Sequence, residues 1–597
     1  MRLASKHPLL VGATLLFVAT GGLYGCKNFL NDAAQPEGTL NESTLENQLG
    51  VEGTLVGAYR ALDCTSIVQA NWGCAASDWV WGSVAADDAN KGSDATDQPP
   101  INDIEGHHWS TPDAQTYLNE KWRISYEGVV RANSTLRLLK EVTKAHPGLI
   151  STADANGIAG EAIFLRAHYH FEAWKMWGNI PYYREDDADF RKPNLTSDAV
   201  ATELLKDLDS AIKLLPSTPR NGEKGRASSW TAKAYKGRVQ VYAGKYADAI
   251  ATLQEVRNSG PYALEKSYDR VWTGFADEAN GPETIWAYQA STNDGEPNGN
   301  NANYGERLNF PYSGSHFGCC GFNQPSQNLV NFFKVDANGL PLALSDPNNW
   351  NSTSANFTAA NKAPVDPRLD WTVGRDGVPY KDWGLYSTAD GWVRDIQNGG
   401  PYSPKKNAHE KASGAESNVG WQNTQLNSVN IHLYRYADLL LLLAEAMVET
   451  NDLNGARTIV NQIRARAGVT AQGKGTGRSD LAVPINDPSI TWAVYKVGQY
   501  TSFPSQSYAR DAVRAERRLE LAMEGQRLFD LRRWGIYDAT INGYVNGIGG
   551  GAEKTRRLYL ASAEPISARH RWYPIPDLQI QLSQVGSTAQ LKQNTGW

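Results

Sequence analysis

The sequence lacks an excess of charge of either sign. Its lysines and arginines number 58 and its aspartates and glutamates 64, for a formal net charge of -6 over 597 residues. No long run of like charge occurs along the chain. Proteins that bind nucleic acid gather lysine and arginine on one face, because the phosphate backbone has to be neutralised. The balance of charge therefore argues against a nucleic-acid partner.

Long hydrophobic runs and catalytic signature motifs are also missing from the body of the chain. The strongest apolar run, Leu439–Leu443, is closed by Asp438 and Glu445. It is much shorter than the roughly 20 apolar residues that a membrane-spanning helix needs, so it predicts a core helix. No H-E-x-x-H, G-x-S-x-G or phosphate-loop string occurs. We therefore predict a protein that is not an enzyme.

Cysteine is scarce, with 5 residues in the chain and no C-x-x-C pair, so no metal site is predicted. Apart from Cys26, the cysteines are Cys64, Cys74, Cys319 and Cys320, and export would allow them to form disulfides. Pairing Cys64 with Cys74 closes a short loop and leaves Cys319 and Cys320 to bond to each other. The other connectivities would join the segment that contains Cys64 and Cys74 to the segment that contains Cys319 and Cys320. The sequence leaves the choice between these connectivities open.

The first 25 residues have the pattern of a lipoprotein signal peptide. Arg2 and Lys6 precede an apolar stretch, Leu9–Ala19, which is too short to span a membrane. The tetrapeptide at 23–26 resembles a bacterial lipobox, although its second residue is a tyrosine where a small residue is usual. We expect Cys26 to be acylated and to anchor the protein to a membrane through its lipid alone. The alternative is an ordinary secreted protein with a chance cysteine.

Helical periodicity dominates two blocks of the remaining chain, which predicts a mainly α fold. We expect residues 26–597 to form a single domain, in which 26–257 and 431–597 build a helical scaffold. Residues 258–430 between them are rich in Gly, Asn, Pro and aromatic residues and predict a loop-rich insertion that forms a binding face. Loops of this length inside a compact chain are usually functional or disordered, and the aromatic content argues against disorder.

Several helices can be placed along these blocks. Asp113–Lys144 predicts one long helix with Tyr126, Val130 and Leu138 on its apolar side. A second helix ends at Gly178–Pro181 and should be buried nearly all round, because Ile163, Ala167, His170, Trp174 and Trp177 line one face while phenylalanines fill another. Two helix pairs, Ser229–Val256 and Tyr436–Ala467, are similar to tetratricopeptide units, and Gly468 is expected to end the second pair.

The stretch from Ser507 to Gly535 resembles the C-terminal signature of the SusD/RagB family of nutrient-binding outer-membrane lipoproteins. Further segments carry the resemblance over nearly the whole mature chain, and their order and spacing together are specific: Cys26–Leu30, Ala159–Tyr183, Tyr434–Gly468, Arg514–Gly535 and Trp572–Asn594. Asp366–Trp383 and Gly400–Asn407 are similar to a subset of that family.

The resemblance implies a SusD-like helical scaffold with tetratricopeptide-type helix pairs and a loop-rich ligand-binding face. It also implies a lipid-anchored protein on the surface of the bacterial outer membrane. Such a protein captures an oligosaccharide or a peptide and acts as the lid of a SusC-like TonB-dependent transporter. No cofactor is implied; a structural calcium ion in the Asp- and Asn-rich loops is an alternative that the residues do not support further.

The signature itself is interpreted as structural. Its helix has an apolar side formed by Ala512, Ala515, Leu519 and Ala522. Asp511 with Arg514, and Glu524 with Arg527, are spaced to form surface ion pairs one turn apart.

A sugar has apolar CH faces and a polar rim, so it is bound by aromatic rings together with polar side chains. Two loops of the sequence contain both kinds of residue. In the first loop we predict ligand contacts from Trp72, Trp79, Trp81, Asp88, Asn90 and Lys91. On an extended strand Trp79 and Trp81 would share one face, and their alternative is to pack inward. In the second loop, which a Cys319–Cys320 bond would stiffen, we predict contacts from Tyr304, Arg307, Tyr312 and Phe317.

Two competing functions fit parts of the sequence. A tetratricopeptide-type scaffold that binds only protein would use the helix pairs but has no need for long aromatic insertions. A surface glycoside hydrolase would need two opposed carboxyl groups, and Asp87, Asp88 and Asp94 are the nominees.

Overall fold

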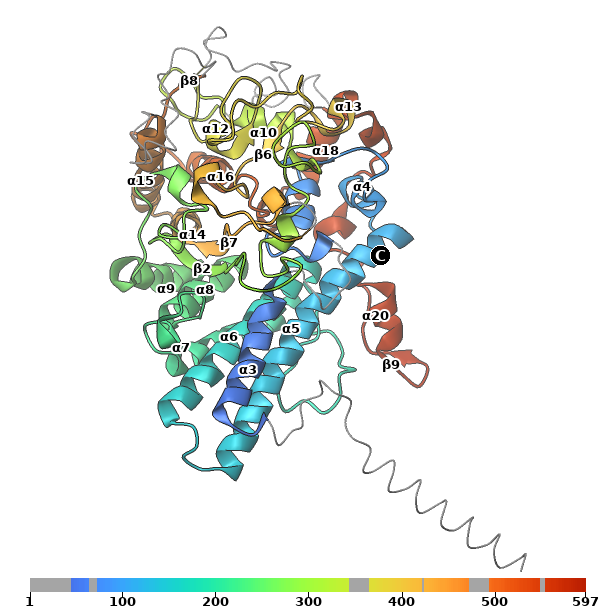
Figure 1. The fold of residues 1–597 in the computed structure, drawn as a ribbon, viewed down its shortest axis with the longest axis vertical. Helices are drawn as coiled ribbons and strands as arrows, with labels where there is room; N and C mark the ends of the chain where they lie inside the picture. Colours follow the sequence, from blue (N-terminus) through green and yellow to red (C-terminus); the bar gives the residue numbers. More distant parts are fainter. Residues whose placement is uncertain (1–44, 64–71, 343–363, 421–422, 472–492, 548–552) are drawn as a thin grey trace, which may run out of the picture.

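The computed structural model describes residues 45–63, 72–342, 364–420, 423–471, 493–547 and 553–597. The predicted signal peptide, the acylation site Cys26 and the disulfide candidate Cys64 lie outside these residues. Long helices form one end of the molecule, and loops with short elements form the other (Figure 1). The fold is mainly α, as predicted.

The first helical layer contains α3 (Gln48–Tyr59), α5 (Pro112–Ala145), α6 (Thr152–Trp177) and α7 (Ser197–Leu214), and neighbouring helices pack along their lengths (Figure 1). Side-chain oxygens of Asn47, Thr111, Ser151 and Thr196 accept backbone N–H groups at the four helix starts. The helices α5 and α6 approach closely at Gly128, where an added Cβ would lie 2.4 Å from the Tyr169 ring.

The predicted all-round burial of α6 is confirmed from Gly157 to its end, and the helix stops at Gly178, whose φ is 68°. The expectation for Val130 is wrong, because this side chain lies on the outer side of α5 and is 54% exposed. The adjacent Val129 is the residue that faces the core, with 2% exposed.

Both predicted helix pairs are present. The first is α8 (Ser229–Tyr242) with α9 (Tyr246–Ser259), and the second is α14 (Tyr436–Glu449) with α15 (Leu453–Ala471). The helix α14 packs against α9, which joins the two blocks, and its leucines from 439 to 443 are buried, as expected of a core helix. The prediction that Gly468 ends α15 is wrong. The helix continues through this position, where an added Cβ would have only one neighbour, the Val497 Cβ at 4.0 Å.

The signature helix α16 (Gln506–Leu521) is the centre of a buried network of charges. Arg368 from the insertion donates to Asp366, to Glu516 Oε1 at 2.7 Å and to Glu520 Oε2 at 2.9 Å. Glu520 also binds Arg435 and Arg466. The predicted apolar side of α16 is confirmed, whereas the Glu524–Arg527 pair is not. Glu524 binds Arg435 and Lys406, and Arg527 binds Asp87. Tertiary contacts thus replace the local pair.

The described part of 258–430 contains only short elements, in agreement with the predicted loop-rich insertion. They are β2 (Thr284–Tyr288), β3 (Phe322–Pro325), α10 (Gln327–Phe332), β4 (Pro364–Val365), α12 (Leu369–Thr372), β5 (Val373–Gly374), α13 (Ile396–Gly399) and β6 (Ser403–Pro404). The strand β2 pairs antiparallel with β7 (Ile431–Arg435), β4 pairs parallel with β8 (Val494–Tyr495), and β5 pairs antiparallel with β6. A separate aromatic core holds part of this region together, including Phe310, Phe317, Tyr380 and Trp392.

The chain closes with α17 (Arg527–Arg533), α18 (Tyr537–Asn546), α19 (Glu553–Arg556), α20 (Asp577–Leu582) and the hairpin of β9 (Gln584–Val585) and β10 (Thr588–Ala589). The segment at 572–576 lies against the end of α6, where Trp177 Nε1 donates to Pro574 O at 3.0 Å. Among the described residues, no helix is both long enough and apolar enough to cross a membrane.

Candidate functional site

The two loops predicted to bind ligand lie side by side. The strand β1 (Ala89–Gly92) from the first loop pairs antiparallel with β3 from the second, with Gly92 opposite Phe322. Beyond this pair, Ser93 N donates to Gly321 O at 2.5 Å. Residues more than 200 positions apart in the sequence therefore form one surface, since Trp79 and Gly305 are separated by 226 residues and share a hydrogen bond.

The expectation that Trp79 and Trp81 form an exposed platform is wrong, because both side chains are 0% exposed. Their segment is a π-helical turn, η3 (Trp79–Val84), and not the extended strand on which the prediction relied. Each indole N–H donates to a backbone carbonyl, Trp79 to Gly305 O at 3.1 Å and Trp81 to Gly73 O at 2.5 Å. These two rings hold the loop in place from inside.

Four more predicted contact residues are buried and already engaged. Asp88 forms an ion pair with Arg518, at 2.9 Å between Oδ1 and Nε. Asn90 donates to Gly399 O, and Lys91 Nζ donates to the carbonyls of Asp94 and Asp97. Phe317 lies in the aromatic core of the insertion. The structure corrects their expected role: they position the loops, and the ligand would have to be met by other side chains.

Trp72, Tyr304 and Arg307 form a stack at the junction of the two loops. The rings of Trp72 and Tyr304 are 5.7 Å apart with an interplanar angle of 21°. The Arg307 guanidinium lies 4.6 Å from the centre of the Tyr304 ring and 5.3 Å from that of Trp72. Trp72 is 6% exposed, whereas Tyr304 and Arg307 are half-buried. This stack keeps three predicted residues together as candidates for ligand contact.

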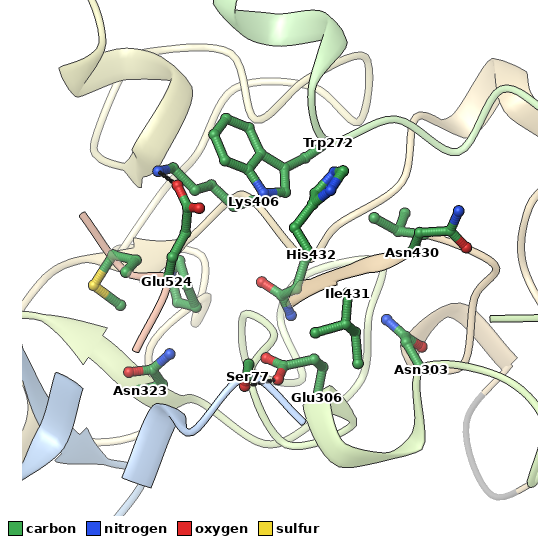
Figure 2. A pocket seen from close by; sticks show the side chains of 14 residues that line it. Ser77, Trp272, Asn303, Glu306, Asn323, Lys406, Asn430, Ile431, His432 and Glu524 are labelled. Atoms are coloured by element: carbon green, nitrogen blue, oxygen red, sulfur yellow. Dashed lines mark hydrogen bonds and ion pairs between the residues drawn. The ribbon is translucent and has the colours of Figure 1, made fainter. Parts of the chain in front are cut away.

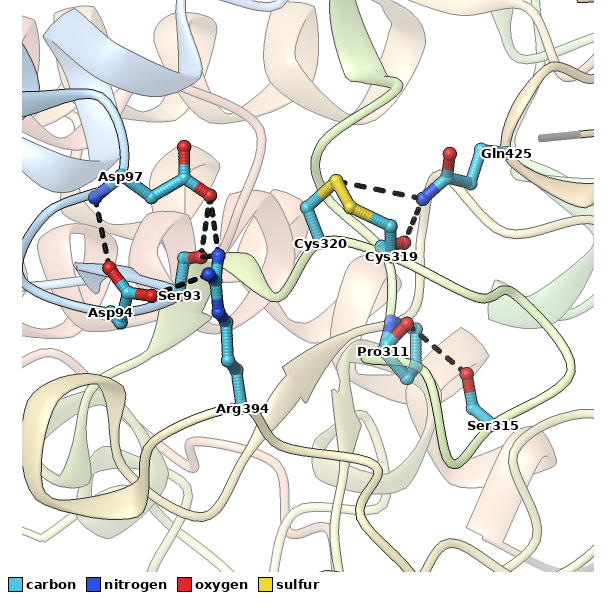
Figure 3. Close-up of a disulfide and its surroundings, with 9 residues drawn as sticks. All are labelled: Ser93, Asp94, Asp97, Pro311, Ser315, Cys319, Cys320, Arg394 and Gln425. Carbon is cyan, nitrogen blue, oxygen red and sulfur yellow. Dashed lines mark hydrogen bonds and ion pairs between the residues drawn. A yellow bond between two sulfur atoms is a disulfide. The ribbon is translucent and has the colours of Figure 1, made fainter. Parts of the chain in front are cut away.

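Tyr312 is half-buried, and it lies beneath an arginine that the sequence did not single out. The Arg394 guanidinium is 5.4 Å from the centre of the Tyr312 ring. Its two ends bind Asp94 at 2.6 Å and Asp97 at 2.8 Å. Figure 3 shows this ion pair cluster beside the bond between Cys319 and Cys320. Arg394 thus joins the first loop to residues of the insertion.

One of the connectivities considered for the cysteines is present. Cys319 is bonded to Cys320, and the Gln425 amide donates to Cys319 O (Figure 3). Cys74 is also disulfide-bonded, and Cys64, the partner that would close a short loop, lies outside the described residues.

A solvent-open pocket, with an empty volume of about 540 Å³, adjoins the stack through the chain neighbours Asn303 and Glu306. The 3₁₀ turn η6 (Tyr304–Glu306) and its N-cap residue Asn303 connect the two sites: Tyr304 belongs to the stack, and Asn303 and Glu306 line the pocket. Figure 2 shows Trp272 and Lys406 on one side and Ser77 and Glu306 on the opposite side. The remaining lining side chains come from β3, β7 and the end of the signature region and include Asn323, Ile431, His432, Met523 and Glu524.

Three polar side-chain atoms of this pocket are buried without a hydrogen-bond partner among the described residues: Asn303 Nδ2, Asn323 Oδ1 and His432 Nδ1. The side chains of Asn303 and Asn323 belong to residues that are 1% and 2% exposed. A buried polar atom without a partner costs about 1–3 kcal/mol. A ligand with hydroxyl groups can both donate and accept, so it could satisfy all three atoms.

Burial controls the protonation of the charged groups in the pocket. It raises the pKa of Glu306 to about 7, against the opposing effect of hydrogen bonds from Ser77 and Asn309. It lowers the pKa of the Lys406 ammonium to about 8, although Glu524 Oε1 lies 2.6 Å away. Lys406 also lies 4.1 Å from the centre of the Trp272 ring. The pocket therefore combines the ion pair of Lys406 and Glu524, the aromatic ring of Trp272 and amide groups.

Most residues of this pocket were missed from the sequence. Trp272, Asn323 and His432 come from three segments without a distinctive local pattern, and only the fold brings them together. Lys406 and Asn407 lie in the string Gly400–Asn407 that resembles part of the SusD/RagB family, so this string was the available signal. No group of three His, Cys, Asp or Glu residues suited to a metal ion occurs in the described ranges.

Comparison with protein families gives two matches. The model described as "SusD family" matches residues 282–597, and the model described as "Starch-binding associating with outer membrane" matches residues 70–241. A curated relative, the SusD-like protein P38 of Formosa agariphila, is 24% identical over 557 residues, which are 89% of this chain and 93% of the relative. A SusD-like protein of Bacteroides ovatus is 23% identical over 465 residues, with coverages of 73% and 71%.

Solved structures share the fold. A laminarin-binding SusD-like protein superimposes with a TM-score of 0.64 at 22% identity, covering 92% of this chain and 100% of its own. Surface glycan-binding protein A of Bacteroides thetaiotaomicron, solved with laminarihexaose, gives a TM-score of 0.65 at 19% identity, with coverages of 92% and 99%.

Proposed function

The chain belongs to the SusD family, and we propose that it binds an oligosaccharide nutrient at the surface of the bacterial outer membrane. The observation that carries this proposal is the pocket next to the Trp72–Tyr304–Arg307 stack, with its aromatic ring and the buried Asn303 Nδ2 and Asn323 Oδ1, which have no partner among the described residues. Sugar rings present apolar CH faces to such rings and hydroxyl groups to such amides. The relatives named as laminarin-binding or glycan-binding support the same class of ligand.

The second part of the proposal concerns the partner and the location. The protein would be anchored through acylated Cys26 and would deliver its ligand to a SusC-like TonB-dependent transporter as the lid of that transporter. The resemblance to the SusD/RagB family and the family description "associating with outer membrane" support this part. The role is one of binding, and two of the solved structures that share the fold are named as laminarin-binding and glycan-binding proteins.

Native mass spectrometry of the mature protein with laminarihexaose, maltohexaose and a peptide of similar mass tests the ligand class. We expect a mass increase equal to one intact hexasaccharide. Tyr304→Ala and Trp272→Ala should each weaken binding about tenfold, because a stacking contact is worth about 0.5–1.5 kcal/mol and the rest of the site remains.

The matched control is Tyr508→Ala, which removes a tyrosine that is 41% exposed on α16, away from the pocket. If the protein binds the peptide and neither hexasaccharide, its ligand is a peptide and the proposal of an oligosaccharide ligand is wrong. Shortened sugars in the spectrum would contradict a binding role and favour a hydrolase.

A further inference from the structure

The charged side chains of the signature region are almost all committed to partners inside the protein. Glu516 binds Arg368 and Arg464, Arg517 binds Asp438 and Asp530, and Arg518 binds Asp87 and Asp88. These pairs explain why the region contains so many charges although it is buried. They also make any guanidinium that has no carboxylate partner conspicuous.

Arg514 is such a group. The sequence predicted an ion pair with Asp511, but within the part of the chain that the structure describes Arg514 forms no ion pair or hydrogen bond. Its guanidinium instead lies 5.1 Å from the centre of the Trp534 ring. Burial lowers its pKa, and the charges of Glu445 and Asp511 only partly oppose this effect. The half-buried cation therefore has unused capacity for an anion.

The other arginines around it are not available in the same way. Arg510 holds Glu449 through two bonds, of 2.7 and 2.8 Å. Arg533 holds Glu445 and Asp530, with 2.7 Å between Nη2 and each carboxylate. Glu445 and Glu449, two of the three carboxylates whose charges act on Arg514, are thus already bound to other arginines.

Arg514 opens into a second pocket, which we call the arginine notch. It has an empty volume of about 530 Å³ and is lined by Tyr246, Glu445, Val448, Glu449, Arg510, Val513, Arg514, Arg533 and Trp534. Arg510 and Arg533 are each paired with a glutamate of the notch, so among the described residues Arg514 is the lining arginine that no direct ion pair holds. Trp534, whose Nε1 is buried without a partner among the described residues, lines the same notch as Arg514. The notch is built by α9, α14, α16 and α17 of the scaffold, and shares no residue with the pocket of Figure 2.

We propose that the arginine notch binds a carboxylate group. The fork of Arg514 matches the two oxygens of a carboxylate, and Trp534 Nε1–H adds a donor that a carboxylate can accept from. The carboxylate can belong to a small organic acid or to an acidic side chain of a protein that docks on the scaffold. The arginine notch is separate from the proposed glycan pocket, so a failure of one proposal does not affect the other.

Indole resonances of the ¹⁵N-tryptophan-labelled mature protein test this proposal. The resonance that disappears in Trp534→Phe identifies Trp534 Nε1–H. Succinate and the peptide acetyl-Gly-Glu-Gly-amide serve as probes of a free acid and of a side chain. We expect a saturable downfield shift of this resonance, because the indole N–H gains an acceptor. A shift with succinate alone assigns the site to small acids, and a shift with the peptide as well assigns it to side chains.

The variant Arg514→Gln should weaken the affinity measured from this shift at least tenfold. Arg514→Lys keeps the charge without the guanidinium fork, so its affinity should lie between those of the native protein and Arg514→Gln. Arg123→Gln is the matched control, because Arg123 is an exposed arginine on α5 and its removal changes the net charge equally. No shift with either probe, an unchanged shift in Arg514→Gln, or the same shift with sodium chloride at equal ionic strength would overturn the proposal. Thermal melting of each variant verifies that it is folded.

Discussion

At the scale of single residues, the tryptophans show that one residue type serves two purposes in this protein. Trp79 and Trp81 are wholly buried, and their indole N–H groups are satisfied by backbone carbonyls. Trp272 is also mostly buried, but it lines a pocket with Asn303 and Asn323, each of which has one buried amide atom without a partner among the described residues. The difference lies in what surrounds each ring, and the local sequence does not contain that information.

Glu306 provides a prediction on pH. Its pKa in the folded protein is about 7, above its ordinary value of 4.5, so the folded state holds the proton more tightly than the unfolded chain does. The stability from this group is therefore complete below about pH 4.5 and is lost as the pH rises through about 7, with a total of about 3 kcal/mol. Glu306→Gln, which resembles the neutral acid, should gain about that amount relative to the native protein between about pH 4.5 and about pH 8.

Urea denaturation of both proteins over this range measures the difference in the free energy of unfolding. The exposed Glu141→Gln, with no buried carboxyl removed, is the control. A constant difference between Glu306→Gln and the native protein at every pH would disprove the shifted pKa.

At the scale of elements, the signature helix α16 was recognised from the sequence and was correctly interpreted as structural. Its apolar side follows from helical spacing, because residues three and four apart share a face. The charge partners of the signature region did not follow from spacing. Glu524, which lies beyond the end of α16 at Leu521, is bound by Arg435, which is 89 positions away, and not by its neighbour Arg527. A buried carboxylate takes the partners that the fold supplies, and local pairs on a helix contribute only about 0.2–0.5 kcal/mol.

Arg368 tests the importance of this network. Arg368→Met would leave Asp366, Glu516 and Glu520 buried without one of their cations, so the free energy of unfolding should fall by about 3–5 kcal/mol. Arg123→Met, which breaks an exposed pair with Glu120, should cost about 0–1 kcal/mol. Urea denaturation of both variants gives the comparison, and similar losses would show that the buried network contributes no special stability.

At the scale of the whole molecule, the end of the chain closes over the scaffold. Asn594 Nδ2 donates to Trp177 O at 2.8 Å and to Tyr573 O at 3.0 Å, across 417 residues in the first case. These bonds hold the segment at 572–576, with its two prolines, against the end of α6.

Asn594→Ala should lower the free energy of unfolding by about 1–3 kcal/mol, because it removes the donor from two carbonyls at a buried contact. Gln581→Ala, on the exposed side of α20, should have little effect. The two variants can be compared by thermal and urea unfolding. An Asn594→Ala protein as stable as the native one would mean that the end of the chain is held by its apolar contacts alone.

The sequence by itself determined the mainly α class, the long helices, the end of α6 at Gly178, the two helix pairs, the loop-rich insertion and the family resemblance. These features depend on periodicity, capping residues and the order of motifs, which are properties of neighbouring residues. Only the tertiary structure decided which aromatic rings of the two loops face outward. It also placed Trp272, Asn303, Asn323 and His432 around one pocket. A binding surface assembled from distant segments depends on the packing between them, and that packing is settled by the burial of the whole chain.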